Sequence, residues 1–533
     1  MNRAAVAAAI CGITLLSFFV FPGHTWLQQD TQIYVPILEH LEHPQVLQRD
    51  LLVEYPHVSF TVYDEVAIGL RRITGLDFEY VLGGLQIIFR AFGVWGVYLL
   101  ALSAGLEAWG ALFVAAVFSL GATIAGPSVL TFEYEPTPRA FALPLVFCAI
   151  GLVTRQRYRA AGIAAAAAFL IHAPTTVPFW AAMPWITWRA RRKALPVWMS
   201  LACACVIMAI AVALQTGPHD NQEFFARLTS AQESVQRMRG AYNWISSWPA
   251  YVIAQHFVLY GIGLLAWWRV RRWLNPEFEA FALILPAIGI LSMPLSYLFL
   301  EKMRWALIPQ LQPVRTLLFI AGFAVILGAI AAIRAANLWE SIAWCALVFY
   351  IPMRTELLTV PSWRIVLAML FLAVLWGRLQ PAGRIHPALT TLAPALLAFL
   401  WIPFAGGVRN YPDLHTPQVH ALAEWARRNT APEAVFLFPD AGKDLASGIF
   451  RVEAGRAIYA DWKGGGQVNY LKEFADEWRV RWELINEIGF TDDAIPRYRS
   501  MGIQYLVVHP SHGFTTIEPI YHNSLYAVYR IAG

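Results

Sequence analysis

Charged residues are scarce in this chain of 533 residues. They make up 14% of it, while apolar residues make up 58%, and a soluble domain usually carries about 25% charged residues. The apolar residues are gathered into long runs, which excludes an ordinary soluble protein and predicts a polytopic α-helical membrane protein. The net charge of +5 comes from short Arg clusters between these runs, so we expect no nucleic-acid partner.

Cysteine is equally sparse, and it carries no motif. All five cysteines lie in apolar runs without a disulfide or metal-ligand partner at a useful spacing: Cys11, Cys148, Cys203, Cys205 and Cys345. We expect Cys203 and Cys205 to be small core residues. Glu39, His40, Glu42 and His43 share a short predicted helix, but no further ligand is fixed beside them. The sequence therefore names no certain cofactor and leaves a divalent metal open.

The apolar runs predict about 13 transmembrane helices between residues 1 and 405. Short runs at 160–175 and 177–188 are counted as two of them. With Arg3 in the cytoplasm, alternation places every tight basic cluster on the cytoplasmic face, as the positive-inside rule requires. These clusters include residues 155–159, 189–193 and 269–272.

The same alternation places the long first loop, 22–80, and the tail, 406–533, outside the cytoplasm. The tail has ordinary soluble composition and predicts a small extracytoplasmic α/β domain. Its expected helices are 416–430, with Thr416 as N-cap, and 467–488; its expected strands are 435–439, 457–461, 503–510 and 525–531. The turn "WKGGGQ" (462–467) lacks the context of a phosphate-binding loop.

The first loop opens on "HTWLQQDTQIYVP" (24–36), which places Asp30 just beyond the first apolar run. Asp30 is either a solvated residue beside a membrane span or a reactive carboxylate. Asp50 is a second acid of this loop that lies among apolar residues, and it is the other candidate for a catalytic role.

A second acidic motif is "FEYEPTPR", with Glu133, Glu135 and Arg139. A Glu–Arg pair there either locks the loop or faces a substrate. His172 lies at the outer end of a span, where it is either an interfacial hydrogen-bonding group or part of a site.

A cationic loop precedes a later span and carries Lys302, Arg304, Gln310 and Arg315. Such residues either extend their charged ends to the membrane surface or hold a lipid phosphate, which Arg can contact through two hydrogen bonds. The acids, the histidine and the cations all converge on the outer face. The candidate substrate-binding residues are therefore Glu133, Glu135, Arg139, His172, Lys302, Arg304, Gln310 and Arg315.

With its "QQDTQIY", "EPTPRAFALPL", "FLIHAP" and "QLQPVR" motifs, the chain resembles the GT-C superfamily of integral-membrane glycosyltransferases, in particular a bacterial branch of it. The resemblance implies transfer of a hexosyl or pentosyl group, with inversion, from a polyprenyl-phosphate carrier to a glycan, lipid or protein acceptor at the bacterial inner membrane. It implies that Asp30 is the catalytic base, with Asp50 as second candidate, and that Arg315 and its neighbours face the donor phosphate.

Two other readings stay open. A transporter or flippase of a lipid-linked or anionic substrate would need charges near the middle of the membrane and often contains repeated, broken helices. Arg90 is the main intramembrane charge, and no internal repeat is visible. A non-catalytic membrane scaffold with a partner-binding outer domain is the third.

Overall fold

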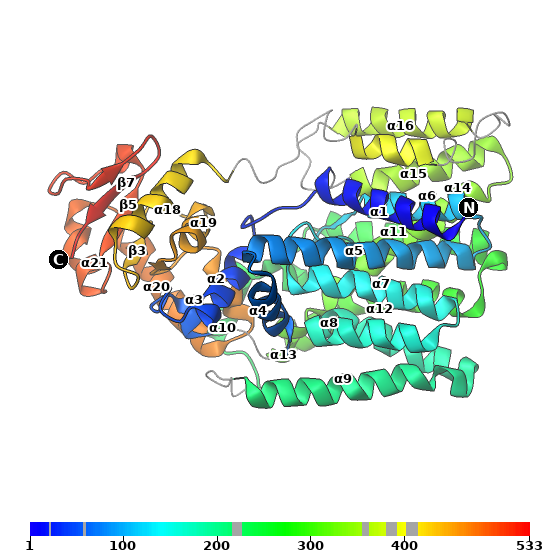
Figure 1. Cartoon of the computed structure of the whole chain (residues 1–533), viewed down its shortest axis with the longest axis horizontal. Coiled ribbons are helices and arrows are strands. Elements are labelled where there is room, and N and C mark those ends of the chain that lie inside the picture. Colours follow the sequence, from blue (N-terminus) through cyan, green and yellow to red (C-terminus); the bar gives the residue numbers. More distant parts are fainter. Residues whose placement is uncertain are drawn as a thin grey trace.

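The computed structural model describes residues 1–20, 23–56, 60–215, 226–353, 362–379, 392–400 and 414–532. A bundle of roughly parallel and antiparallel helices holds the N-terminus at its far end, and an α/β unit (residues 414–532) with the C-terminus lies at the other end (Figure 1). The predicted boundary between residues 405 and 406 falls outside the described residues, so the division into domains stays a prediction.

Six helical segments of the described chain are long and apolar enough to cross a membrane. They contain α5 (Phe78–Ser103), α8 (Tyr158–Ala190), α9 (Leu195–Leu214), α11 (Ala250–Val270), α12 (Pro276–Ser296) and α14 (Leu318–Ile333). Shorter apolar helices accompany them: α1 (Arg3–Phe19), α6 (Ala108–Ser119), α7 (Pro138–Thr154), α15 (Leu338–Met353) and α16 (Ser362–Leu379). The polytopic helical architecture is confirmed, and the exact number of 13 spans stays a prediction.

Helix α8 contains both short runs that the sequence separated, and it folds back on itself at His172. This residue is extended (φ −156°, ψ 86°) inside an otherwise helical segment. A Cβ on Gly162 would lie 2.9 Å from Val197 Cα, and Thr187 accepts a 2.9 Å hydrogen bond from the neighbouring Trp198. In a straight helix, Gly162 and Thr187 would be about 37 Å apart, so the two arms of α8 must run antiparallel.

Pro174 helps to produce this reversal, because proline disfavours helical geometry in the residue before it and cannot donate a backbone hydrogen bond. The carbonyls freed at the bend are satisfied by the first loop. Leu170 O accepts from Val62 N at 2.9 Å, and Ile171 O accepts from Thr61 Oγ1 at 2.8 Å. The first loop is thereby fixed to the outer end of the bundle.

The basic clusters meet at the end of the bundle away from the α/β unit. Arg269 pairs with Glu340 at 2.5 Å and donates a hydrogen bond to the carbonyl of Arg334. The guanidinium of Arg334 in turn donates to the carbonyl of Gly105. On the same side, Asn275 donates to Thr154 O at 2.6 Å. The clusters therefore share one face, as the alternation predicted, and the cytoplasmic identity of that face stays a prediction.

The α/β unit contains a five-stranded sheet in the order β4-β3-β5-β7-β6, with β3 parallel to β4 and β5, and β7 antiparallel to β5 and β6. Its elements are α18 (Pro417–Asn429), β3 (Val435–Leu437), α19 (Ala446–Ala454), β4 (Ala457–Ile458), α20 (Lys472–Ile488), α21 (Ile495–Ser500), β5 (Tyr505–Val508), β6 (Tyr521–His522) and β7 (Ala527–Arg530). Four strands lie within the predicted ranges, Thr416 caps α18 as expected, and β6 was not predicted.

Side chains of the sheet alternate between two cores, as the two-residue period of a strand requires. Phe436 and Val507 pack on the side of α18 and α19, whereas Leu437 and Leu506 pack with Ile485 of α20 and Tyr498 of α21. Helices therefore cover both faces of the sheet. Its β3 and β4 lead directly into the loops that face the bundle.

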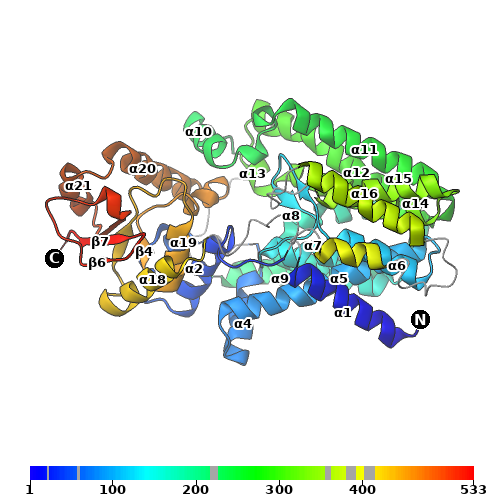
Figure 2. The ribbon, with the colours of Figure 1, turned by 90° about the horizontal axis from the view of Figure 1, so that it is seen from above.

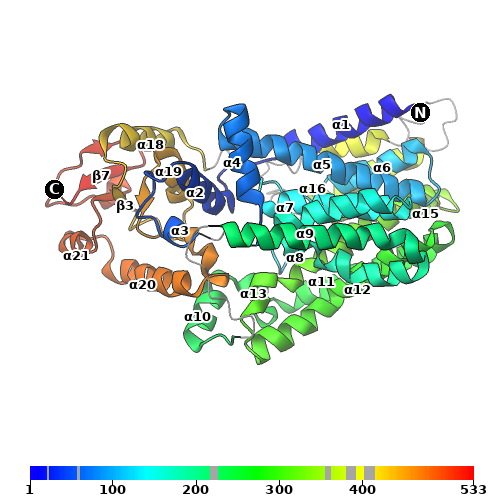
Figure 3. The ribbon, with the colours of Figure 1, turned by 60° about the horizontal axis from the view of Figure 1, so that its bottom comes forward.

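The first loop forms α2 (Thr31–Glu42), α3 (Leu51–Glu54) and α4 (Tyr63–Thr74). Helices α2 and α3 lie against the α/β unit, while α4 projects from the side of the bundle (Figures 2 and 3). Asp50 caps α3 and pairs with Arg451 of α19 at 2.7 Å, and Arg451 also pairs with Asp461 at 2.5 Å. All three side chains are at most 4% exposed, so a buried ion cluster joins the two parts.

Replacing Arg451 should therefore loosen the α/β unit. Arg451→Met leaves two carboxylates buried without their cation, and we expect it to lower the free energy of unfolding by about 3–5 kcal/mol. Arg428→Met is the matched control, because the Arg428–Glu424 pair is 72% and 54% exposed and should change stability by less than about 0.5 kcal/mol. Thermal unfolding and limited proteolysis of the purified protein check this; equal stability of both variants would contradict it.

Candidate active site

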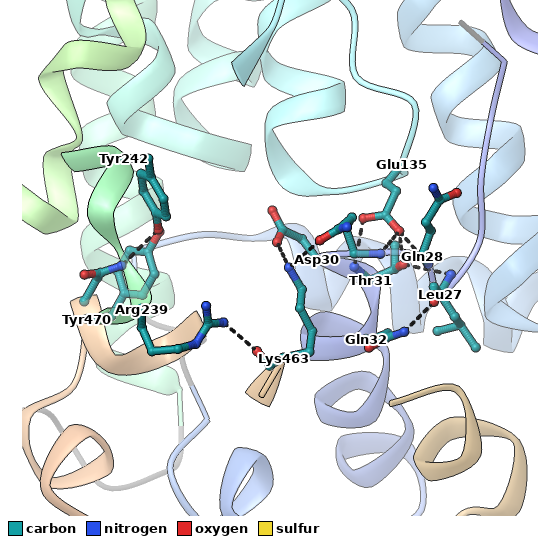
Figure 4. Close-up of polar contacts among 12 residues, drawn as sticks. Leu27, Gln28, Asp30, Thr31, Gln32, Glu135, Arg239, Tyr242, Lys463 and Tyr470 are labelled. Carbon is teal, nitrogen blue, oxygen red and sulfur yellow. Dashed lines mark hydrogen bonds and ion pairs between the residues drawn. The ribbon is translucent and has the colours of Figure 1, made fainter. Parts of the chain in front are cut away.

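A polar cavity of about 360 Å³ lies between the outer end of the bundle and the α/β unit. Six parts of the chain meet around it: the first loop, the loop before α7, the bend of α8, the end of α10 (Ser230–Arg239) with the turn that follows, the segment before α14 and the segment after β4. Figure 4 shows residues from four of them: the first loop, the loop before α7, the end of α10 with its turn, and the segment after β4. The cavity's charged and hydrogen-bonding lining residues include Gln29, Asp30, Tyr34, Glu133, Glu135, Arg139, His172, Arg239, Tyr242, Arg315, Lys463, Gln467 and Tyr470.

Asp30 precedes the first residue of α2 and turns its carboxylate into this cavity. Lys463 Nζ lies 2.7 Å from Asp30 Oδ1, and the side chain of Asp30 is 37% exposed. Burial by itself would raise the pKa of Asp30, but Lys463, Arg139 and Arg239 together hold that pKa below its ordinary value of 3.8. Asp30 is therefore ionised at neutral pH.

Glu135 fixes the backbone that carries Asp30. Its Oε1 accepts hydrogen bonds from Gln28 N at 2.9 Å, Gln29 N at 2.7 Å and Thr31 Oγ1 at 2.7 Å. Burial and the charge of Asp30 raise the pKa of Glu135, while its hydrogen bonds with Thr31 and Gln29 oppose the shift. The structure thus brings Glu135 into the site as a group that positions Asp30.

Glu133 and Arg139 form the ion pair that the sequence proposed, with Arg139 Nε 2.5 Å from Glu133 Oε1. Arg90 approaches the same loop from α5. Its guanidinium donates to the carbonyl oxygens of Ser17 at 2.6 Å and of Glu133 at 2.5 Å. The intramembrane charge of Arg90 therefore holds the end of α1 against the loop before α7.

Arg239 and Arg315 are the cations of the cavity for which the described residues provide no ion pair. The Nε atoms of both are buried, and neither has a hydrogen-bond partner among the described residues. Arg239 stacks 4.2 Å from the centre of the Trp462 ring, and Arg315 lies 5.2 Å from that of Tyr242. Because a half-buried cation whose donor atom lacks a hydrogen-bond partner is costly, these two residues point to an anionic ligand.

An apolar groove, also of about 360 Å³, adjoins the polar cavity. The two share Tyr34, His172 and Tyr470, and the groove is otherwise walled by residues such as Phe169 and Leu307. His172 contacts Thr175 Oγ1 through its Nδ1 at 2.8 Å. Gln310 also lines the groove and donates to the Tyr470 carbonyl at 3.3 Å.

Three candidates lie outside both hollows. Asp50 is 1% exposed and binds Arg451 and the backbone of Leu52 and Ile458. Lys302 lies over the ring of Tyr297 at 5.2 Å, and Arg304 pairs with Glu233 at 3.0 Å.

Sequence reasoning missed Arg239, Tyr242, Lys463, Gln467 and Tyr470. For Lys463 and Gln467 the available signal was the run "WKGGGQ" (462–467), in which a lysine lies between a tryptophan and three consecutive glycines. For Arg239 and Tyr242 the available signal was the short motif "RMRGAYN" (237–243). Within the described residues, no group of three or more His, Cys, Asp or Glu side chains is arranged to hold a metal ion.

Comparison with known proteins supports the fold. The apo structure of ArnT from Cupriavidus metallidurans superposes with a TM-score of 0.51 at 13% identity, over 99% of this chain and 98% of ArnT. The structure of the same protein bound to undecaprenyl phosphate gives a TM-score of 0.50 at 13% identity, over the full length of both. The chain thus shares the overall fold of ArnT over its whole length.

Other comparisons are narrower. The arabinofuranosyltransferase AftD from Mycobacteria gives a TM-score of 0.47 at 13% identity, and this chain spans 40% of its length. Residues 417–485 match the family described as a domain of unknown function, DUF6798. No curated protein sequence matches the chain.

The role of Glu135 can be tested apart from any activity. Glu135→Ala removes the acceptor of four hydrogen bonds, and each unsatisfied buried donor should cost roughly 1–3 kcal/mol. We expect the amides of residues 27–31 to exchange hydrogen faster in the variant, as measured by mass spectrometry, with Glu135→Gln closer to the native chain because it keeps one acceptor oxygen. Unchanged protection in Glu135→Ala would show that another contact fixes this backbone.

Proposed function

We propose that this chain is a membrane glycosyltransferase that moves a sugar from a polyprenyl-phosphate-linked donor to an acceptor hydroxyl, with Asp30 as general base. One observation carries the proposal: an ionised carboxylate and two arginines without ion pairs face a cavity that adjoins an apolar groove. This arrangement suits a substrate that is part lipid, part phosphate and part sugar.

The donor would lie across both hollows. Its isoprenoid chain would occupy the apolar groove, and its phosphate would lie between Arg239 and Arg315, which can make charge-assisted hydrogen bonds to it. The bound undecaprenyl phosphate in the ArnT structure supports this choice of lipid, because that protein shares the fold. The sugar would then point toward Asp30.

The reaction follows from these positions. The acceptor hydroxyl transfers its proton to Asp30 while its oxygen attacks the anomeric carbon of the sugar. The bond from that carbon to the phosphate oxygen breaks, and the phosphate leaves with the electron pair. Arg239 and Arg315 stabilise the negative charge that develops on it. Attack opposite the leaving phosphate inverts the anomeric configuration, and Asp30 later releases its proton to water.

The proposal includes a location and an acceptor class. The chain would lie in the bacterial inner membrane, with its N-terminus and basic clusters in the cytoplasm and the α/β unit outside. The acceptor would be a glycan, lipid or protein on that outer side. A transporter loses its main support, because Arg90 is occupied by the carbonyls of Ser17 and Glu133.

Asp30→Asn tests the base directly, because it keeps the size of the side chain but cannot accept the proton. We expect turnover to fall by roughly 10²–10⁴-fold with unchanged expression. Mass spectrometry of lipid-linked sugars and envelope glycans in a deletion strain would identify donor and product, and the variant would be measured for its ability to restore the product.

Asp77→Asn is the matched control, since Asp77 belongs to the same loop and its side chain is 79% exposed. It should restore the product as the native gene does. Transfer at the native rate by Asp30→Asn would remove Asp30 as base.

Arg315→Gln tests the phosphate site. Losing a charge-assisted hydrogen bond costs about 1.5–3 kcal/mol, so the donor KM should rise about 10- to 150-fold. Arg304→Gln is the control of the same chemistry outside the cavity and should leave KM unchanged. Equal donor kinetics for both variants would assign Arg315 to a structural role.

A further inference from the structure

Residues 462–470 form one wall of the cavity, although they belong to the segment matched as a domain of unknown function. Lys463, Gly466, Gln467 and Tyr470 all line it. This wall is held from the membrane side: Asn469 donates to Tyr242 Oη at 2.9 Å, and Gln312 donates to Tyr470 Oη at 2.8 Å.

The glycines of this wall are required by close packing. A Cβ on Gly465 would lie 2.4 Å from the Trp478 ring, and one on Gly466 would lie 2.6 Å from Ile33 Cδ1. A larger residue at position 465 would displace the segment from α20, and one at position 466 would have to move the Ile33 side chain of α2. The glycine run therefore sets the backbone of Lys463 close enough for its side chain to enter the cavity.

Lys463 contacts Asp30 and its neighbour Gln29. Its Nζ is 2.7 Å from Asp30 Oδ1 and 3.3 Å from Gln29 Oε1, and its side chain is 11% exposed. A base whose oxygen is bound to an ammonium group is poorly placed to accept a proton from a hydroxyl. Arg239 reaches the same residue from the other side, with its guanidinium 3.5 Å from the Lys463 carbonyl.

An anion held by Arg239 would therefore enter beside Lys463. A sugar-linked phosphate diester carries a negative charge of its own, and the flexible four-carbon stem of lysine allows its ammonium group to change partners. The backbone of Lys463 need not move for this exchange, because the packed glycines fix it.

We propose that Lys463 is a phosphate-binding residue of the donor site and that it covers Asp30 until a polyprenyl phosphate draws its ammonium group away. The inference rests on the proposed function and gives the segment 417–485 a role in the transfer site. The base becomes available to an acceptor hydroxyl once the donor is bound, so the donor binds first.

The direct test is a structure of the native chain in lipid nanodiscs with undecaprenyl monophosphate as the probe. We expect Lys463 Nζ at hydrogen-bond distance from a phosphate oxygen and no longer in contact with Asp30. An ammonium group that stays on Asp30 beside a bound phosphate would overturn this inference and leave the proposed function standing. If undecaprenyl monophosphate does not bind, the proposed donor itself is wrong.

Binding measurements give an independent check. Lys463→Met should weaken the affinity for undecaprenyl monophosphate by about tenfold or more, Lys463→Arg should keep most of it, and Lys302→Met, a matched lysine outside the cavity, should have no effect. Native affinity in Lys463→Met would also overturn the inference. Inorganic phosphate serves as a competitor: displacement at similar concentrations would identify the ligand as a free anion and contradict a lipid donor.

Discussion

The site depends on the hydrogen bonds that Glu135 accepts from the backbone and side chain of residues 28–31. Those residues come from the first loop and Glu135 comes from the loop before α7, so this contact aligns the start of α2 with the cavity. Arg90 and the reversal of α8 serve the same end, since both attach these loops to the bundle. A soluble-looking loop is thus given a fixed position at the end of a membrane bundle.

Charge balance explains why the cavity suits an anion. Asp30 is paired with Lys463 and Glu133 with Arg139, while Glu135 is satisfied by backbone and hydroxyl donors. Arg239 and Arg315 then remain as cations without a direct ion pair within the described residues. Their desolvation is offset only when a negative group lies between them.

The sequence predicted the bundle, and in the α/β unit it predicted α18, α20 and four of the five strands but not α19, α21 or β6. It also named as site residues six that line the cavity: Asp30, Glu133, Glu135, Arg139, His172 and Arg315. These follow from hydropathy, strand alternation and the convergence of polar residues on one face. Helix α8 contains the two runs that hydropathy separated, and its arms run antiparallel as two neighbouring spans would; only the structure shows that they meet at His172 without a loop.

The remainder of the site could not be read from the sequence for a physical reason. Lys463 and Arg239 enter the cavity because glycines beside them pack closely against residues far along the chain. Such contacts leave no local pattern in the sequence. Asp50, Lys302 and Arg304 line neither hollow, and their predicted roles stay predictions. Asp50 pairs with Arg451 and Arg304 with Glu233, far along the chain, whereas Lys302 lies over the ring of Tyr297 in its own helical segment.

The separation of Asp30 and Lys463 by 433 residues also has a consequence for biogenesis. At about 5–20 residues per second, the ribosome makes Lys463 roughly 20 to 90 s after Asp30. During that interval the first loop has already been made, but its later partners have not: the Lys463 ammonium group, Arg451 and the wall of residues 462–470. A chain released early would contain every acid of the cavity but not the wall that completes it. The proposed site therefore forms only when the last quarter of the chain has been made.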